Sequence, residues 1–177
     1  NLIKFKKEDE VISFIEKIKT KFLMDDVLHS VLGLAYYQKN KLDTAKKFLL
    51  TSISLNKKNS SAFTLLGDCF LATGDIKNAK KNYENSLNID PYNKMALNNL
   101  AALSFYNGDL IKAEKIYKLS VVYNENNYDG MYCLSQCQLA KGDFITGWKN
   151  FEYRWLANEF NSKKLKSNLP KFNLNTG

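Results

Sequence analysis

The chain has 177 residues, of which 45% are hydrophobic and 25% charged, and its formal net charge is +8. This balance lies close to the globular average and excludes a disordered or low-complexity chain. No apolar run approaches the roughly 18 residues that a membrane-spanning helix requires. Only two prolines and eight glycines interrupt the sequence, which favours helices.

The positive charge is carried by lysine, since Arg154 is the only arginine. A nucleic-acid groove usually includes several arginines for bidentate contacts, so we interpret the charge as a solvated lysine surface and expect no nucleic-acid partner. Cys69, Cys133 and Cys137, with His29 as the single histidine, do not form a pattern typical of a zinc site or a disulfide framework. A reducing, cytoplasmic compartment is therefore expected.

The first predicted element is a helix over residues 7–22, because Val11, Ile15 and Ile18 follow helical spacing. Its register matches the second helix of a preceding repeat. Residues 1–25 are therefore predicted to be a partial repeat that caps the N-terminal end. The sequence begins with Asn1 rather than Met, which leaves open a removed signal peptide or a longer parent chain.

Three series of residues recur every 34 positions. They are Leu32-Gly33, Leu66-Gly67, Leu100-Ala101 and Leu134-Ser135; Ala45, Ala79, Ala113 and Gly147; and Leu49, Tyr83, Tyr117 and Phe151. Small residues allow two helices to approach closely, and large ones fill the space between units. The pattern resembles the tetratricopeptide repeat (TPR), a 34-residue helix–turn–helix unit that stacks on its neighbours. This resemblance implies an all-α, right-handed α-solenoid.

The turn residues agree with this period. Gly74-Asp75, Gly108-Asp109 and Gly142-Asp143 each place a permissive glycine before an aspartate suited to a helix N-cap, and Asn40 replaces the glycine in the first unit. The predicted units are residues 26–59, 60–93, 94–127 and 128–157. Residues 158–177 lose helical periodicity and are predicted to form an extended tail or linker.

The first helix of each unit lines the concave side of such a solenoid. The predicted second helices carry Lys46, Lys47, Lys77, Lys80, Lys81, Lys112, Lys115 and Lys118, whereas the first helices are nearly uncharged. Helical spacing predicts that rings, amides and hydroxyls face the groove, namely Tyr37, Thr64, Asp68, Asn98, Phe105, Tyr132 and Gln136. This mixture suits an extended peptide or a partner helix. The alternative is that some of these residues only pack within the helix layer.

The sequence predicts no catalytic residues, no cofactor and no metal site. It holds no Gly-rich phosphate loop or paired metal ligands, and His29 is expected to be structural. Cys133 and Cys137 lie one helical turn apart and are interpreted as small buried hydrophobes. The predicted function is therefore a non-enzymatic scaffold for protein–protein interaction, with a protein or peptide as partner.

The segment "GDFITGWKNFEYRW" ends the fourth unit and departs from the earlier ones. Arg154 stands where those units have serine, and Trp148, Phe151 and Trp155 form an i, i+3, i+7 stripe. These four residues are predicted to dock the tail, a second copy in a homo-oligomer, or a following domain. The segment resembles the closing repeat of bacterial TPR proteins that precedes a glycosyltransferase-like domain. That resemblance implies an alternative function as the substrate-presenting arm of a larger enzyme.

Overall fold

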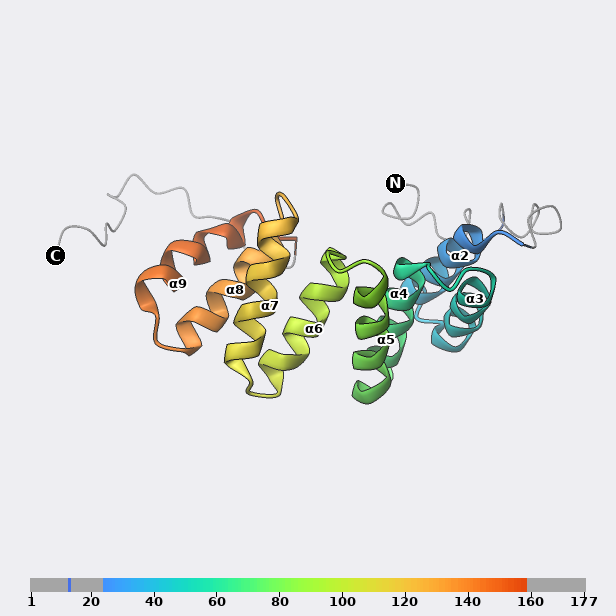
Figure 1. Ribbon diagram of the computed structural model, residues 1–177, viewed down its shortest axis with the longest axis horizontal. Helices are drawn as coiled ribbons and strands as arrows, with labels where there is room; N and C mark the ends of the chain where they lie inside the picture. Colours follow the sequence, from blue (N-terminus) through green and yellow to red (C-terminus); the bar gives the residue numbers. More distant parts are fainter. Residues whose placement is uncertain (1–12, 14–23, 159–177) are drawn as a thin grey trace. The chain divides into compact units, whose positions relative to one another are not determined.

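The computed structural model describes residue 13 and residues 24–158, and these residues form helices and turns without a strand (Figure 1). The chain divides into two compact units, residues 1–96 and 97–177. The helix predicted over residues 7–22 and the tail predicted after residue 158 lie outside the described residues, apart from Ser13. The prediction of an all-α fold built from helix–turn–helix pairs is confirmed.

The first unit contains two helical pairs. Their helices are α2 (Asp26–Gln38), α3 (Leu42–Leu55), α4 (Ser60–Ala72) and α5 (Ile76–Ile89). Helix α4 contacts both α2 and α3, so the second pair stacks on the first. A buried cluster between them contains Ala45, Leu49, Ala62, Leu65, Leu66 and Cys69. Removal of this apolar surface from water stabilises the stack.

The second unit repeats this arrangement, and α6 crosses the division between the two units. Its helices are α6 (Lys94–Tyr106), α7 (Leu110–Tyr123), α8 (Tyr128–Ala140) and α9 (Phe144–Phe151), followed by the 3₁₀ helix η3 (Glu152–Trp155). Helix α8 contacts α7, α9 and η3. The buried cluster contains Ala101, Ala113, Tyr117, Leu134 and Cys137. The first helices of the four pairs begin at positions 26, 60, 94 and 128, which again differ by 34 residues.

The turns within the pairs have the predicted backbone geometry. Gly74, Gly108 and Gly142 have φ values of 77°, 82° and 85°, and Asn40 has a φ of 57° at the corresponding place. These left-handed conformations suit glycine, and asparagine tolerates them better than other residues. The aspartates that follow the glycines are N-caps, because each side chain accepts a hydrogen bond from the amide three residues later.

Two glycines allow close contact between the helices of a pair. A Cβ atom on Gly67 would lie 2.5 Å from Cε1 of Tyr83, and one on Gly33 would lie 2.5 Å from Cγ of Leu49. Tyr83 and Leu49 are both fully buried. The close approach expected from the small residues is confirmed, and the large residues, which were expected to fill the space between units, also pack against these glycines within a pair.

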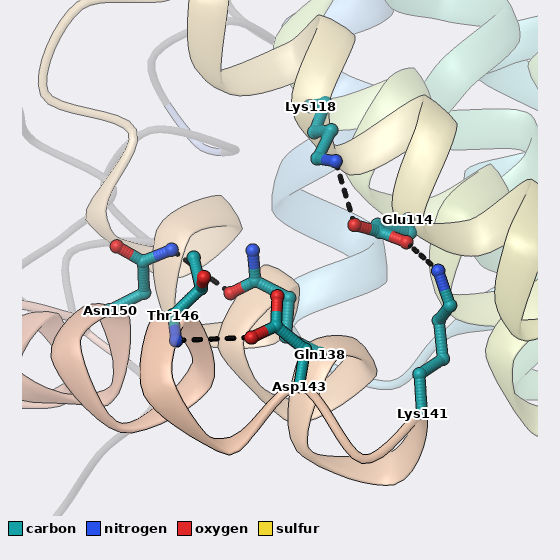
Figure 2. Close-up of polar contacts among 7 residues, drawn as sticks. All are labelled: Glu114, Lys118, Gln138, Lys141, Asp143, Thr146 and Asn150. Carbon is teal, nitrogen blue, oxygen red and sulfur yellow. Dashed lines mark hydrogen bonds and ion pairs between the residues drawn. The ribbon is translucent and has the colours of Figure 1, made fainter.

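A charged bridge ties α7 to the turn after α8 (Figure 2). The carboxylate of Glu114 accepts hydrogen bonds from the ammonium groups of Lys118, at 2.7 Å, and Lys141. Only 11% of the Glu114 side chain is exposed. The hydrogen bonds from Lys118 and Lys141 lower the pKa of Glu114. In the first unit Lys46 donates a hydrogen bond to Thr73 Oγ1 across the same 27-residue spacing. The same two repeat positions are therefore joined by a polar contact in both units.

The lowered pKa of Glu114 predicts a pH dependence of stability. The ionised carboxylate contributes its full stabilisation to the folded state at pH values above its pKa in the unfolded chain, about 4.3. This stabilisation is lost as the pH falls through the lower pKa of the folded state. We expect Glu114→Gln to cost about 1–2 kcal/mol at neutral pH and to flatten the fall in stability below about pH 4. Urea denaturation at several pH values measures both effects. Parallel pH curves for the variant and the wild type would contradict the assignment.

Candidate functional site

A pocket of about 310 Å³ lies between the first helices of the second unit, α6 and α8. It contains four of the seven predicted groove residues, Asn98, Phe105, Tyr132 and Gln136. The remaining lining residues are Asn99, Ala102, Tyr106, Tyr117, Asp129 and Cys133. We refer to it as the α6–α8 pocket. Rings supply its apolar surface, and amide, carboxylate and hydroxyl groups supply hydrogen-bonding capacity.

Ala102 explains why space opens at this place in the chain. The residues at the corresponding position of the other first helices are Leu34, Asp68 and Gln136. Leu34 packs against the core of the first unit, and Asp68 accepts a hydrogen bond from the Tyr83 hydroxyl at 2.8 Å. Alanine has no atoms beyond Cβ, so neither kind of contact forms at position 102.

The wall of the pocket is held by a network centred on Asn98 and Asn127. Asn127 is 2% exposed. Its Nδ2 donates to Ser120 Oγ at 2.8 Å and to Asn98 Oδ1 at 3.2 Å, and its Oδ1 accepts from Asn98 Nδ2 at 3.1 Å. Ser120 Oγ also donates to Asn98 Oδ1 at 2.7 Å. These bonds fix the Asn98 side chain, so it frames the pocket as a rigid wall.

The predicted groove residues of the first unit are placed differently. Thr64 is 2% exposed and its hydroxyl lies 2.8 Å from Ser86 Oγ on α5. Asp68 is 9% exposed and is bound by Tyr83. The expectation that these two side chains face a groove therefore requires correction, because both serve to join α4 to α5. Tyr37 is partly buried against the core, and its burial and the nearby Asp68 raise its pKa.

Aromatic residues gather at the C-terminal end of the second unit. The Phe151 ring lies 5.3 Å from that of Trp148 and 5.5 Å from that of Tyr132, measured between centroids. Because Tyr132 also lines the α6–α8 pocket, the aromatic cluster is continuous with the pocket wall. Trp148 is 50% exposed, and Phe144, Ile145 and Leu156 are exposed beside it in the sequence. Apolar surface therefore remains uncovered on α9 among the described residues.

Arg154 is packed inside this cluster. Its guanidinium carbon lies 4.4 Å from the centroids of both the Phe151 and Trp155 rings, a cation–π geometry. Nη1 donates to the Phe151 carbonyl at 2.8 Å and to Glu152 Oε1 at 3.0 Å. Arg154 thus pairs locally with Glu152. With 16% of its side chain exposed, Arg154 supports the cluster from within.

The predicted stripe of Trp148, Phe151 and Trp155 on one α-helix requires correction. Helix α9 ends at Phe151 and the chain tightens into η3. At the position of Arg154, the earlier second helices carry Ser52, Ser86 and Ser120, each fully buried. A guanidinium group is too large for a site that holds a serine hydroxyl. The chain then turns back toward α8, where the Asn158 amide donates to Asp129 Oδ1 at 2.7 Å.

The single histidine and the cysteines take structural or peripheral places. His29 is 5% exposed and its Nδ1 lies 2.8 Å from the Asp25 carbonyl, as expected of a structural residue. Cys137 is fully buried as predicted, and burial raises its pKa to about 12. Cys133 is only half-buried and lines the α6–α8 pocket, which the sequence did not indicate. No cluster of potential metal ligands occurs within residues 24–158.

Among the helices of residues 24–158, none is both long enough and apolar enough to cross a bilayer.

Comparisons with known proteins agree with the helical pairing. Residues 28–59 and 60–93 match the family model of the tetratricopeptide repeat. No curated protein matches the chain. A crystal structure of MamA is 16% identical, covers 83% of this chain and 86% of its own, and has a TM-score of 0.68. The structure of the pilF protein of Pseudomonas aeruginosa is 16% identical, covers 84% of this chain and 68% of its own, and has a TM-score of 0.73.

A third solved structure matches a similar share of the chain. It is the C-terminal part of a TPR repeat-containing protein from Cytophaga hutchinsonii. It is 17% identical, covers 89% of this chain and 62% of its own, and has a TM-score of 0.68. Likeness at these identities shows a shared fold. The model of the tetratricopeptide repeat thus matches residues 28–93, and the chain has the fold of a TPR solenoid.

Proposed function

We propose that the chain is a protein-interaction scaffold that binds an extended polypeptide segment in the α6–α8 pocket. The observation that carries this proposal is the convergence of Asn98, Phe105, Tyr132 and Gln136, predicted from helical spacing, on one pocket. TPR arrays use surfaces of this kind because each repeat presents its first helix to a ligand. The proposal assigns no catalytic role to any residue.

The lining residues favour a peptide over a nucleic acid. Phe105 and Tyr132 offer rings that bury apolar side chains, and the Gln136 amide pairs with main-chain N–H and C=O groups. Among the described residues of the lining, Asp129 is the only charged one, and none is Lys or Arg. A lining of this charge repels phosphate. Lysines are instead numerous on second helices such as α7, which carries Lys112, Lys115 and Lys118.

A single substitution tests whether the pocket binds peptide. Ala102→Leu copies the residue that α2 carries at this position, Leu34, and fills the space between α6 and α8. We expect peptides of about 12 residues, selected from an unbiased display library on the wild type, to bind this variant about tenfold or more weakly. Fluorescence anisotropy measures the affinities, and thermal denaturation checks that the variant is folded.

Ala102→Ser is the matched control, because it retains a small side chain and should preserve binding. Selected peptides that bind wild type, Ala102→Leu and Ala102→Ser equally well would exclude the pocket as the binding site. A selection that enriches no peptide would count against the proposed function as a whole.

Exposed apolar residues on α9 favour a second candidate function, self-association through the C-terminal end. A terminal repeat presents the face on which a further repeat would stack, and here that end carries Phe144, Ile145 and Trp148, each at least 50% exposed. A second copy presents the same apolar surface and can meet it across a two-fold axis. Phe151, Arg154 and Trp155 support this surface from behind through their mutual packing.

Trp148→Ala tests this second function. We expect the wild type to gain mass with concentration in light scattering and the variant to remain monomeric, because the indole supplies the largest exposed ring of the surface. Val27→Ala, at an exposed apolar site on α2, is the control and should associate like the wild type. A wild-type monomer at every concentration would refute self-association and favour a following domain, such as the glycosyltransferase-like one, as the partner of this end.

A further inference from the structure

The outer face of α7 exposes an apolar stripe that the fold does not require. Ile111 is 76% exposed, Val122 73%, Tyr123 54% and Leu119 39%. A surface depression of about 500 Å³ lies along this helix, and the described residues that line it are Lys112, Lys115, Ile116, Lys118, Leu119, Val122 and Tyr123. We call it the α7 outer face. The residues at positions 112, 115, 116, 119, 122 and 123 recur at the spacing of one helical stripe.

Helix α5 provides an internal comparison. It has the same buried residues as α7, since Ala79, Tyr83 and Ser86 correspond to Ala113, Tyr117 and Ser120, and all are buried. On the outer side, however, Lys77, Asn85 and Asn88 stand where α7 has Ile111, Leu119 and Val122. The second helix of a pair therefore folds with a polar outer face. The aliphatic residues of α7 expose apolar area to water without contributing to the helix pair, which is typical of a contact surface.

The charges around the stripe restrict what can cover it. Lys112, Lys115 and Lys118 border the depression, and the nearby carboxylate of Glu114 is already bound by Lys118 and Lys141. A second copy would bring a second set of lysines against the first. Residues 1–23 contain six lysines and four acidic residues. Residues 159–177 contain four lysines and one acidic residue. Neither terminal segment offers complementary charge.

We propose that the α7 outer face binds an acidic amphipathic helix of a partner protein. Aliphatic or aromatic side chains of that helix, spaced i, i+3 or i+4, and i+7, enter the depression along the stripe, and its Asp and Glu residues pair with Lys112 and Lys115. A protein helix fits better than an anionic lipid surface, because side-chain anchors fill a depression whereas a lipid surface lies flat over it. This site is separate from the α6–α8 pocket and carries a second interaction.

The test selects helix-forming peptides of about 18 residues from a randomised display library. Selection is made on the full chain, and the selected peptides are then tested on the double variant Leu119→Asn/Val122→Asn, which carries the residues that α5 has at these places. Both sites are exposed, so the fold should tolerate the changes. Leu50→Asn, at a 54% exposed leucine on α3, is the matched control. Ala102→Leu serves as a control that alters only the α6–α8 pocket.

The expected result is enrichment of peptides with net negative charge and apolar residues at helical spacing. Their affinity for the double variant should be about tenfold or more weaker than for the wild type, and their affinity for both controls should equal that for the wild type. Their affinity for the wild type should fall as NaCl rises from about 50 to about 500 mM. Enrichment of neutral or basic peptides, or no loss in the double variant, would overturn the proposal. So would the binding of vesicles containing phosphatidylserine, if that binding required Leu119 and Val122 while no selected peptide did.

Discussion

Asn127→Ala is expected to lower the free energy of unfolding by about 3 kcal/mol. The Asn127 side chain is the N-cap of α8, where Oδ1 accepts from the Gly130 amide at 3.1 Å. It also makes the hydrogen bonds to Ser120 and Asn98 that join α8 to α6 and α7. Alanine removes the cap and leaves the buried Ser120 hydroxyl and the partly buried Asn98 amide short of partners, which costs more than either loss alone.

Urea denaturation followed by far-UV circular dichroism measures this loss. Asn88→Ala, at an exposed asparagine of α5, is the control and should change stability by less than about 0.5 kcal/mol. Asn98 lines the α6–α8 pocket, so Asn127→Ala should also weaken the binding of peptides to that pocket. An Asn127→Ala variant as stable as Asn88→Ala would show that the network makes no net contribution.

Tyr83→Leu is expected to cost about 2–3 kcal/mol, because Tyr83 is fully buried and its hydroxyl donates to the buried Asp68 carboxylate at 2.8 Å. The substitution leaves a smaller side chain beside Gly67 and removes a partner of a buried carboxylate. The first pair has leucine at both corresponding positions, Leu34 and Leu49. We therefore expect the double variant Asp68→Leu/Tyr83→Leu to recover part of the loss.

The double-mutant cycle gives the coupling between Asp68 and Tyr83 directly. We expect the double variant to be destabilised by about 1 kcal/mol less than the sum of the two single variants. Denaturation of the wild type, both single variants and the double variant completes the cycle. Additive losses would mean that the hydrogen bond contributes nothing beyond the packing of each side chain.

The period of the sequence predicted the fold because every local signal repeats with it. Gly74 and Asn40 occupy left-handed turns, and Gly67 allows two helices to approach closely, as the residue types at these positions indicated. Backbone conformation at a turn and volume at a helix crossing depend on one or two residues. Such features can be predicted from a single sequence.

Burial of polar side chains was harder to predict, because it depends on a partner that helical spacing alone does not identify. Helical spacing placed Thr64 in the groove, but its hydroxyl is hydrogen-bonded to the hydroxyl of Ser86, 22 residues later in the chain. The recurrence of asparagine at positions 59, 93 and 127 was a usable signal. Each of these side chains caps the next first helix. Together with the buried serines Ser52, Ser86 and Ser120, this series marks the polar network between pairs.

The end of α9 illustrates a different limit. Helical spacing assumes a continuous helix, and Arg154 breaks that assumption because it cannot occupy the buried site of a serine. The α6–α8 pocket was also only partly predictable. Helical spacing predicted four of the residues that line it. The space itself results from Ala102, and its importance becomes clear only when Ala102 is compared with the larger Leu34 and Asp68 at the same position of other repeats.

Chemical-shift mapping of the ¹⁵N-labelled chain, titrated with a peptide selected on the wild type, tests peptide binding at the α6–α8 pocket most directly. The pocket assignment predicts that the largest amide shifts fall on α6 and α8, at Asn98, Phe105, Tyr132 and Gln136, and disappear in Ala102→Leu. Shifts confined to the outer face of α7, to α9 or to the first unit would contradict it.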